Sequence, residues 1–247
     1  MPDPIHQFEI HRWQEFNLFG YDATFTNSSF YMILATAVAS LFLIYAMGGK
    51  ALIPSRLQSI AEIAYEFVAN MLRQATGEHG MKFFPLVFTL FIFIFTVNML
   101  GMIPYAFTAT SHLIIAVALA AIVFFTVLIV GFAKNGLKFL KLFVPSGVPV
   151  YMMPIVVPIE VISFLSRPVS HSMRLFANML AGHIALKVFA GFIVMLLGAG
   201  AWVALSPLPF IMALALTALE FLVAFLQAYV FSMLTCMYLN DALHPGH

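Results

Sequence analysis

Five long stretches of the sequence contain almost no charged residues, and they limit the possible folds more than any other feature. They cover residues 29–48, 83–107, 113–133, 158–197 and 207–240. A helix of about 20 apolar residues spans the hydrocarbon core of a bilayer. The stretches also lack the apolar–polar alternation of membrane barrel strands. We therefore predict an all-α integral membrane protein with five membrane-embedded helices, forming a single membrane domain over residues 1–247.

The composition supports this class, because a water-soluble protein of this size needs more polar surface. The chain is 63% hydrophobic and 9% charged, whereas about a quarter of the residues are charged in an ordinary soluble domain. The formal net charge is +1, which argues against a nucleic-acid partner. We expect membrane lipid to surround the chain.

The last two stretches are longer than a bilayer requires. A helix of about 40 residues is about 60 Å long, about twice the thickness of the hydrocarbon core. The turn-like segment "GAGAWVALSP" separates them. We expect residues 158–240 to form a helical hairpin whose helices are strongly tilted, kinked or extend beyond the membrane.

Residues 55–77 differ from the five apolar stretches, because polar and apolar side chains alternate there with helical spacing. The apolar stripe consists of Ile60, Ala64, Phe67, Met71 and Leu72. Glu62, Glu66 and Arg73 lie on other faces. This pattern predicts an amphipathic helix at the membrane interface and not a sixth span.

Basic residues predict the topology. The first group lies between the first two spans and the second follows the third span: Lys50, Arg56, Arg73 and Lys82, then Lys134, Lys138 and Lys141. Cytoplasmic loops carry an excess of lysine and arginine, so both regions are expected in the cytoplasm. The N-terminal segment 1–28 and the turn near 198–206 then lie outside, and the C-terminus lies inside.

Arg174 lies near the middle of the fourth apolar stretch. At about 100° per residue, several polar residues fall within about 40° of it and form one stripe. They are Glu160, Ser163, Arg167, Ser170 and Asn178. His183 and Lys187 point to the opposite face. In the following helix, Glu220 and Gln227 share a face with Thr217.

A central arginine costs about 2.5–3.5 kcal/mol to insert, so ionisable residues inside a membrane span indicate an ion pathway. Structural roles are the alternatives. Arg167 could extend to the membrane surface, and His171 and Ser170 could be packing groups. Arg174 could form a buried ion pair with Glu220, and Glu220 could be a protonated hydrogen-bonding group.

Other membrane protein classes fit less well. A secondary transporter should show an internal repeat, a retinal protein needs a lysine in its final helix, and a hydrolase should carry a recognisable motif. A structural scaffold would leave Arg174 and Glu220 unexplained. No phosphate-binding loop of the Gly-x-x-x-x-Gly-Lys type occurs, and we expect neither a cofactor nor a metal site.

Three segments resemble subunit a of the F-type ATP synthases. They are "NMLGMIP" (98–104), "MRLFANMLAGH" (173–183) and "TALEFLVAFLQAYVFSMLTCMYL" (217–239), and the resemblance extends over roughly residues 28–245. A histidine at 183 with an acid at 220 resembles the mitochondrial and alphaproteobacterial members, because many other bacterial members carry these two residues in the reverse order.

The resemblance implies a proton-channel stator subunit without catalytic residues. It implies partners, namely a c-ring with rotor carboxylates and b-type peripheral stalk subunits. Arg174 matches the essential arginine, and Asn178, His183, Glu220 and Gln227 match residues of the proton route. Glu160, Ser163, Ser170 and His171 are further candidates for lining a half-channel. The His183–Glu220 pair favours protons over sodium, because imidazole titrates near neutral pH. The expected location is the bacterial inner membrane, with the mitochondrial inner membrane as the alternative.

Overall fold

The fold is that of a computed structural model, which describes residues 10–14, 17–18, 21–22, 24–48, 55–103, 106–144, 149–198 and 200–244. Three residues that the sequence arguments used lie outside these ranges. They are Lys50, from the first basic group, Pro104, the last residue of "NMLGMIP", and Ala199, in the turn-like segment "GAGAWVALSP". Half of the N-terminal segment 1–28 also lies outside the described residues.

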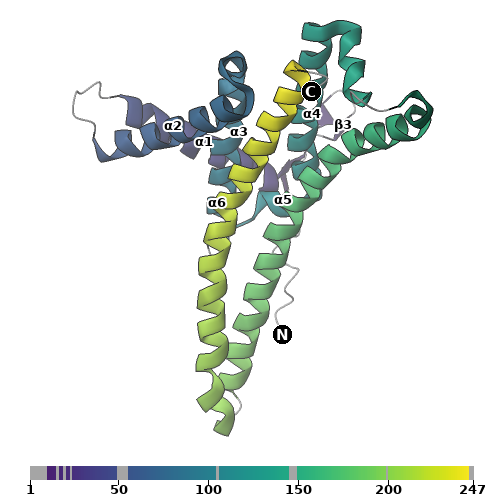
Figure 1. Cartoon of the computed structure of the whole chain (residues 1–247). Helices are drawn as coiled ribbons and strands as arrows, with labels where there is room; N and C mark the ends of the chain where they lie inside the picture. The colour runs from purple at the N-terminus through teal and green to yellow at the C-terminus, as the bar shows by residue number, and fades with distance from the viewer. Residues whose placement is uncertain are drawn as a thin grey trace. The chain divides into compact units, whose positions relative to one another are not determined.

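Most of the described residues form α-helices (Figure 1). The helices are α1 (Asn27–Met47), α2 (Arg56–Thr76), α3 (Phe84–Gly101), α4 (Leu113–Asn135), α5 (Met153–Leu197) and α6 (Pro207–Leu243). Short 3₁₀ helices join them: η2 (Glu78–Phe83), η3 (Ala109–Ser111), η4 (Gly136–Phe143), η5 (Val150–Met152) and η6 (Gly200–Leu205). Five helical segments, all except α2, are long and apolar enough to cross a membrane, which confirms the predicted all-α membrane fold.

Four short strands precede α1 and were not predicted. They are β1 (Arg12–Gln14), β2 (Asn17–Leu18), β3 (Tyr21–Asp22) and β4 (Phe25–Thr26). β1 pairs with β4, and β2 pairs with β3, both antiparallel. Each strand has only two or three residues, too few for the alternating pattern that reveals a strand in a sequence.

The end of α3 differs most from the prediction, because the helix stops at Gly101 and not near residue 107. Beyond it, the chain folds back so that the Thr108 hydroxyl donates to the Gly101 carbonyl at 3.3 Å. A Cβ atom at Gly101 would lie only 2.8 Å from Thr108 Cγ2. A glycine therefore permits this close return, which a composition-based prediction cannot detect.

α5 begins at Met153, five residues before the predicted start, and continues through Pro158 and Pro168. Pro154 lies in the first turn, where proline is tolerated because the backbone N–H groups have no partner within the helix. Pro158 and Pro168 lie in the helix interior, where each proline removes one backbone hydrogen bond. The helix has 45 residues, which at 1.5 Å per residue makes it about 68 Å long. It is therefore more than twice as long as a bilayer core of about 30 Å is thick.

α2 has the predicted helical form. The Ser55 hydroxyl accepts a hydrogen bond from the Gln58 backbone at 3.3 Å and caps its first turn. In the predicted apolar stripe, Met71 and Leu72 are buried, whereas Ile60 is 55% exposed. One part of the apolar stripe of α2 is therefore buried against the chain, and the other part is exposed. An amphipathic pattern alone does not predict which apolar residues the chain itself covers. Its position at the membrane interface stays a prediction.

The chain divides into two compact units that alternate along the sequence. The first unit comprises Met1–Ser40, Phe93–His112 and Leu175–Gln227, and the second comprises Leu41–Ile92, Leu113–Arg174 and Ala228–His247. Helices α1, α3, α5 and α6 contribute residues to both units. The boundary within α5 falls between Arg174 and Leu175.

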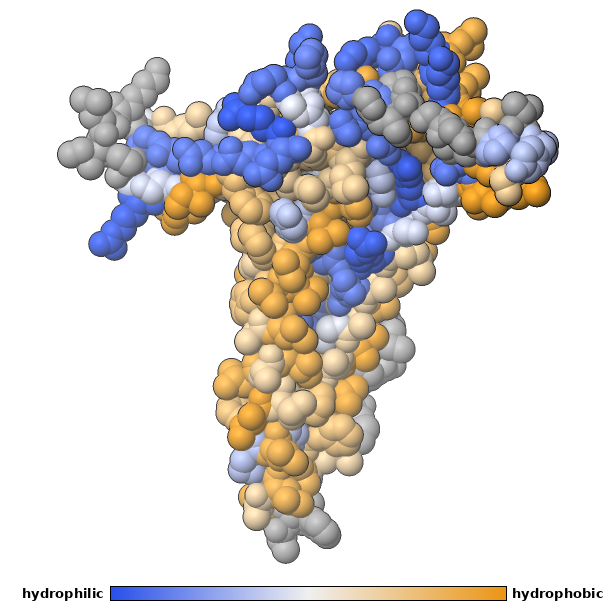
Figure 2. Space-filling model, in the orientation of Figure 1, coloured by the Kyte–Doolittle hydropathy of each residue, from blue (hydrophilic) through white to orange (hydrophobic). Residues whose placement is uncertain are grey.

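In the first unit, the second half of α5 and the first half of α6 lie side by side as an antiparallel pair (Figure 1). The surface of this pair is mostly hydrophobic on the face drawn in Figure 2. Its exposed side chains include Phe192, Val194, Leu208 and Ile211. The antiparallel pairing within this unit agrees with the predicted hairpin, whose full extent over residues 158–240 and whose tilt stay predictions.

The second unit has an aromatic core. Phe139 from η4 is fully buried, and its ring lies 5.0 Å from that of Phe132 and 6.4 Å from that of Phe164, between ring centroids. The Asn135 side chain donates to the Ala242 carbonyl at 2.7 Å and joins the C-terminal ends of α4 and α6. These contacts hold α4, α5 and α6 together in this unit.

Candidate functional site

Glu220 lies on α6 in the first unit and is only 9% exposed. Both of its carboxyl oxygens are buried, and neither has a hydrogen-bond partner among the described residues. Burying an ionised carboxylate without compensation is very costly, and buried polar groups usually have partners. This position therefore combines an acidic group with a local environment that opposes its negative charge.

Gly182 on α5 provides the space for the Glu220 side chain. A Cβ atom at residue 182 would overlap Glu220 Oε1 and lie 3.1 Å from its Cδ. Any larger residue at 182 would push the carboxyl group away from the α5 backbone. Gly182 immediately precedes His183, so the structure brings Glu220 beside the α5 segment that carries the predicted histidine.

His183 is held by a threonine that the sequence analysis did not identify. Its Nε2 lies 3.1 Å from the hydroxyl oxygen of Thr108, and both side chains are buried. The same hydroxyl lies 3.3 Å from the Gly101 carbonyl oxygen. Thr108 therefore joins His183 to the end of α3 and fixes the position of the imidazole ring.

A second polar group joins α3 to α6 near Glu220. The Asn98 amide, which is fully buried, donates to the Ala224 carbonyl at 3.3 Å. Thr110 donates in turn to Asn98 Oδ1 at 2.9 Å. Ala224 is one helical turn after Glu220, and Gln227 follows, also buried. Asn98 was noted only as part of a motif, and the hydroxyl-rich run "TATS" (108–111) was the available signal for Thr108 and Thr110.

Apart from Arg167, the predicted polar stripe of α5 lies largely on the outside of the chain. Ser163, Ser170 and Arg174 in the second unit are exposed, as is Asn178 in the first. Glu160 has intermediate exposure. The stripe thus faces away from the chain's own interior, whereas His183, Glu220 and Gln227 are buried in the first unit.

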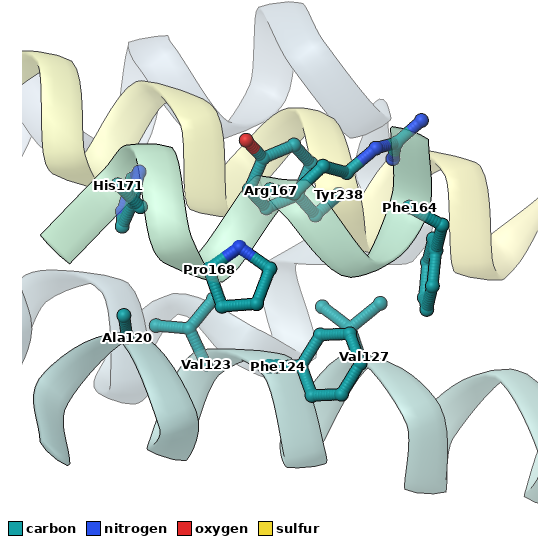
Figure 3. Close-up of a pocket in the computed structure, with 9 residues that line it drawn as sticks. All are labelled: Ala120, Val123, Phe124, Val127, Phe164, Arg167, Pro168, His171 and Tyr238. Atoms are coloured by element: carbon teal, nitrogen blue, oxygen red, sulfur yellow. The ribbon is translucent and has the colours of Figure 1, made fainter. Parts of the chain in front are cut away.

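His171 belongs to the second unit and is 4% exposed. Its ring centroid lies 3.8 Å from that of Phe231, and its Nε2 has no hydrogen-bond partner among the described residues. It lines a small cavity between α4, α5 and α6 (Figure 3). The other lining residues are Ala120, Val123, Phe124, Val127, Phe164, Arg167, Pro168 and Tyr238. The cavity is mostly apolar, so a role for His171 in a half-channel stays a prediction.

Arg167 forms an ion pair with Asp241 near the end of α6, with Nη1 and Oδ2 2.6 Å apart. Its guanidinium carbon also lies 5.4 Å from the Phe164 ring centroid and 5.1 Å from that of Tyr238. At these distances the aromatic rings attract the guanidinium and help to hold the Arg167 side chain in place. Arg167 is therefore a packed group that joins α5 to α6 in the second unit. Asp241 was missed, because its partner is distant in the sequence.

Together, the spanning helices and the ionisable side chains inside two of them define a polytopic α-helical membrane protein with a polar site at mid-helix. The sequence profile of the family described as "ATP synthase A chain" matches residues 29–240, and the chain belongs to this family. This confirms the resemblance that the sequence motifs indicated.

Curated relatives agree over the full length of the chain. A protein of Mesorhizobium japonicum named "ATP synthase subunit a" is 63% identical over 246 residues, covering 99% of this chain and 98% of the relative. Proteins with the same name in Maricaulis maris and Rhodopseudomonas palustris are 60% and 62% identical. Each alignment covers 99% of this chain, with 98% and 99% of the respective relatives.

Proposed function

We propose that this chain is the proton-translocating stator subunit of an F-type ATP synthase, in which two half-channels meet a rotor and couple proton flow to its rotation. Membership in the ATP synthase A chain family supports a role as the proton-translocating subunit of the membrane sector. The single observation that carries the finer proposal is the exposed polar stripe of α5 around Arg174.

An exposed arginine in the middle of an apolar helix is unfavourable against lipid. A partner that carries a carboxylate would make this position favourable, because guanidinium and carboxylate attract each other. Arginine also keeps its charge at any physiological pH. Arg174 would therefore attract each passing rotor carboxylate into its ionised form and prevent a continuous proton path between the two half-channels.

The buried side chains His183, Glu220 and Gln227 of the first unit suit the outer half-channel. We assign them to this route together with the exposed Asn178. Glu220 has a carboxyl group without hydrogen-bond partners among the described residues, and His183 has a ring held by Thr108. We assign Glu160 and Ser163 to the inner half-channel, with Ser170 and His171 as further lining residues. Each proton that crosses gains about 2.3 kcal/mol per 100 mV.

The proposed partners are the c-ring and b-type peripheral stalk subunits, and the proposed location is the bacterial inner membrane, as expected for a relative of bacterial ATP synthase subunits. The two units form a single membrane domain in this proposal, because α5 and α6 pass through both without a break. The strongly tilted hairpin would lie against the curved surface of the rotor.

Cysteine labelling is expected to place residue 138 in the cytoplasm and residue 205 outside, according to the distribution of lysine and arginine. Lys138 and Leu205 are both exposed. The only native cysteine, Cys236, is buried and is removed by Cys236→Ala. Lys138→Cys should then react with an impermeant maleimide from the cytoplasmic side only, and Leu205→Cys from the outer side only. The reverse pattern would refute the proposed topology.

Gly182→Ala is expected to lower proton-driven ATP synthesis by at least about fivefold, because a methyl group would displace the Glu220 carboxyl and such overpacking costs about 1–3 kcal/mol. The measurement uses inverted membrane vesicles, and retrieval of the chain with the c-ring checks assembly. Gly191→Ala is the matched control, since a Cβ at residue 191 meets no atom within 4 Å. Equal rates for both variants in assembled complexes would contradict the assignment of Glu220 to the proton route.

A further inference from the structure

A cleft in the second unit is lined by basic residues and by apolar residues. His79 and Lys82 from η2 and Lys134 from the last turn of α4 supply its basic side chains. Its apolar lining, called the floor below, consists of Phe83, Val130, Ala133 and Leu243. The cleft has a volume of about 360 Å³, within the range of roughly 300–1,000 Å³ typical of small-molecule sites.

The walls of the cleft are held by contacts within the same unit. Asn135, the residue after Lys134, donates to the Ala242 carbonyl at 2.7 Å and fixes the end of α4 against the end of α6. The His79 ring lies edge-on to that of His244, with centroids 6.5 Å apart. η2, α4 and α6 therefore form a defined site and do not merely present lysines on separate loops.

The positive charge of the cleft is not balanced by nearby carboxylates. Glu78 in η2 pairs with Arg73 at 3.0 Å, and Asp241 at the end of α6 pairs with Arg167 at 2.6 Å. Within the part of the chain that the structure describes, neither Lys82 nor Lys134 forms an ion pair. The cleft therefore combines two uncompensated lysines with an apolar floor.

We propose that this basic cleft binds the phosphate headgroup of an acidic phospholipid, with the adjoining acyl chains against its apolar floor. The lysines belong to the groups that the positive-inside rule assigns to the cytoplasm, and acidic lipids give the cytoplasmic leaflet its negative surface potential. Basic pockets between membrane helices on this side bind acidic headgroups. Free phosphate has the same charge chemistry, but it would leave the floor of Phe83, Val130, Ala133 and Leu243 uncovered.

The test uses the assembled ATP synthase in phosphatidylcholine nanodiscs that contain a minor fraction of phosphatidylglycerol with a photoreactive acyl chain. After illumination, crosslinks should map to peptides that contain Val130, Ala133 and Leu243. Each lysine near an acidic headgroup contributes about fivefold to affinity, so Lys82→Gln with Lys134→Gln should lower the crosslinking about 25-fold. Both side chains are exposed, so the substitutions should leave the fold intact.

The matched control is Lys138→Gln with Lys141→Gln. It removes the same charge from η4, outside the cleft, and should leave the crosslinks unchanged. An equal loss in this control would mean general attraction to the surface and would overturn the proposal. Unchanged crosslinking in the cleft variant, equal labelling by photoreactive phosphatidylcholine, or displacement by excess inorganic phosphate would also overturn it. The readout is lipid binding, so it is independent of the proposed proton route.

Discussion

Replacing Arg174 by alanine is expected to abolish proton-driven ATP synthesis. Arg174 lies on the exposed face of α5 with Ser163 and Ser170, where the proposal brings the rotor carboxylates past it. Without the guanidinium, nothing would favour the ionised form of a carboxylate at this position, because a bare charge is costly in an apolar environment. Coupled rotation should therefore stop. Passive proton leak through the membrane sector should rise, since the fixed charge no longer separates the two half-channels.

The Arg174→Lys variant is expected to be severely impaired as well, although it retains a basic group. Lysine lacks the planar group of five donors that binds a carboxylate in two places. A desolvated lysine also loses its proton more readily than arginine does. Impairment of this variant would show that geometry and permanent charge are both required.

ATP synthesis and passive proton conduction are measured in the same membrane vesicles, with assembly checked by retrieval of the c-ring. Val169→Ala is the control, because Val169 is a 60% exposed apolar residue on the same helix. It should retain a rate near that of the parent. An assembled Arg174→Ala complex that still makes ATP near the parent rate would rule out the rotor-facing role and favour a structural role for this arginine.

Glu220→Gln is expected to slow both ATP-driven proton pumping and proton-driven ATP synthesis by about a hundredfold, the lower end of what a positioned proton-transfer group contributes. Glutamine has nearly the same shape, so it should fit beside Gly182 as the acid does. The carboxyl oxygens have no hydrogen-bond partners among the described residues, so the amide removes no such contact. What is lost is the ability to exchange a proton.

The two rates are measured in vesicles that contain equal amounts of assembled complex. Leu219→Met is the control on the same helix, since Leu219 is 52% exposed and the change conserves volume. Parent-like rates in both directions for an assembled Glu220→Gln complex would show that Glu220 is not on the proton route. It would then be a protonated packing group, the alternative that the sequence left open.

The class of fold could be predicted from the sequence because its cause is local. Each apolar stretch is unfavourable in water and is long enough to span a bilayer as a helix. A helix satisfies its backbone hydrogen bonds within itself, as lipid requires. The predicted bounds of the first, third and fifth spans differ from those of α1, α4 and α6 by three residues or fewer. Arg174 and Glu220 could be singled out for the same reason, because the cost of an ionisable group in an apolar helix depends mainly on its immediate surroundings.

Only the tertiary structure showed which residues contact the polar and charged side chains of α5 and α6. The hydrogen bond between Thr108 and His183 joins residues 75 positions apart, and the ion pair between Arg167 and Asp241 joins residues 74 apart. Helical periodicity describes one element at a time and cannot predict such pairs. The sequence gives no sign that Gly182 is special, and only the structure shows that the Glu220 carboxyl packs against it. The apolar periodicity of α2 did not show that the chain buries Leu72 but leaves Ile60 exposed, because burial depends on which neighbouring helices pack against each face.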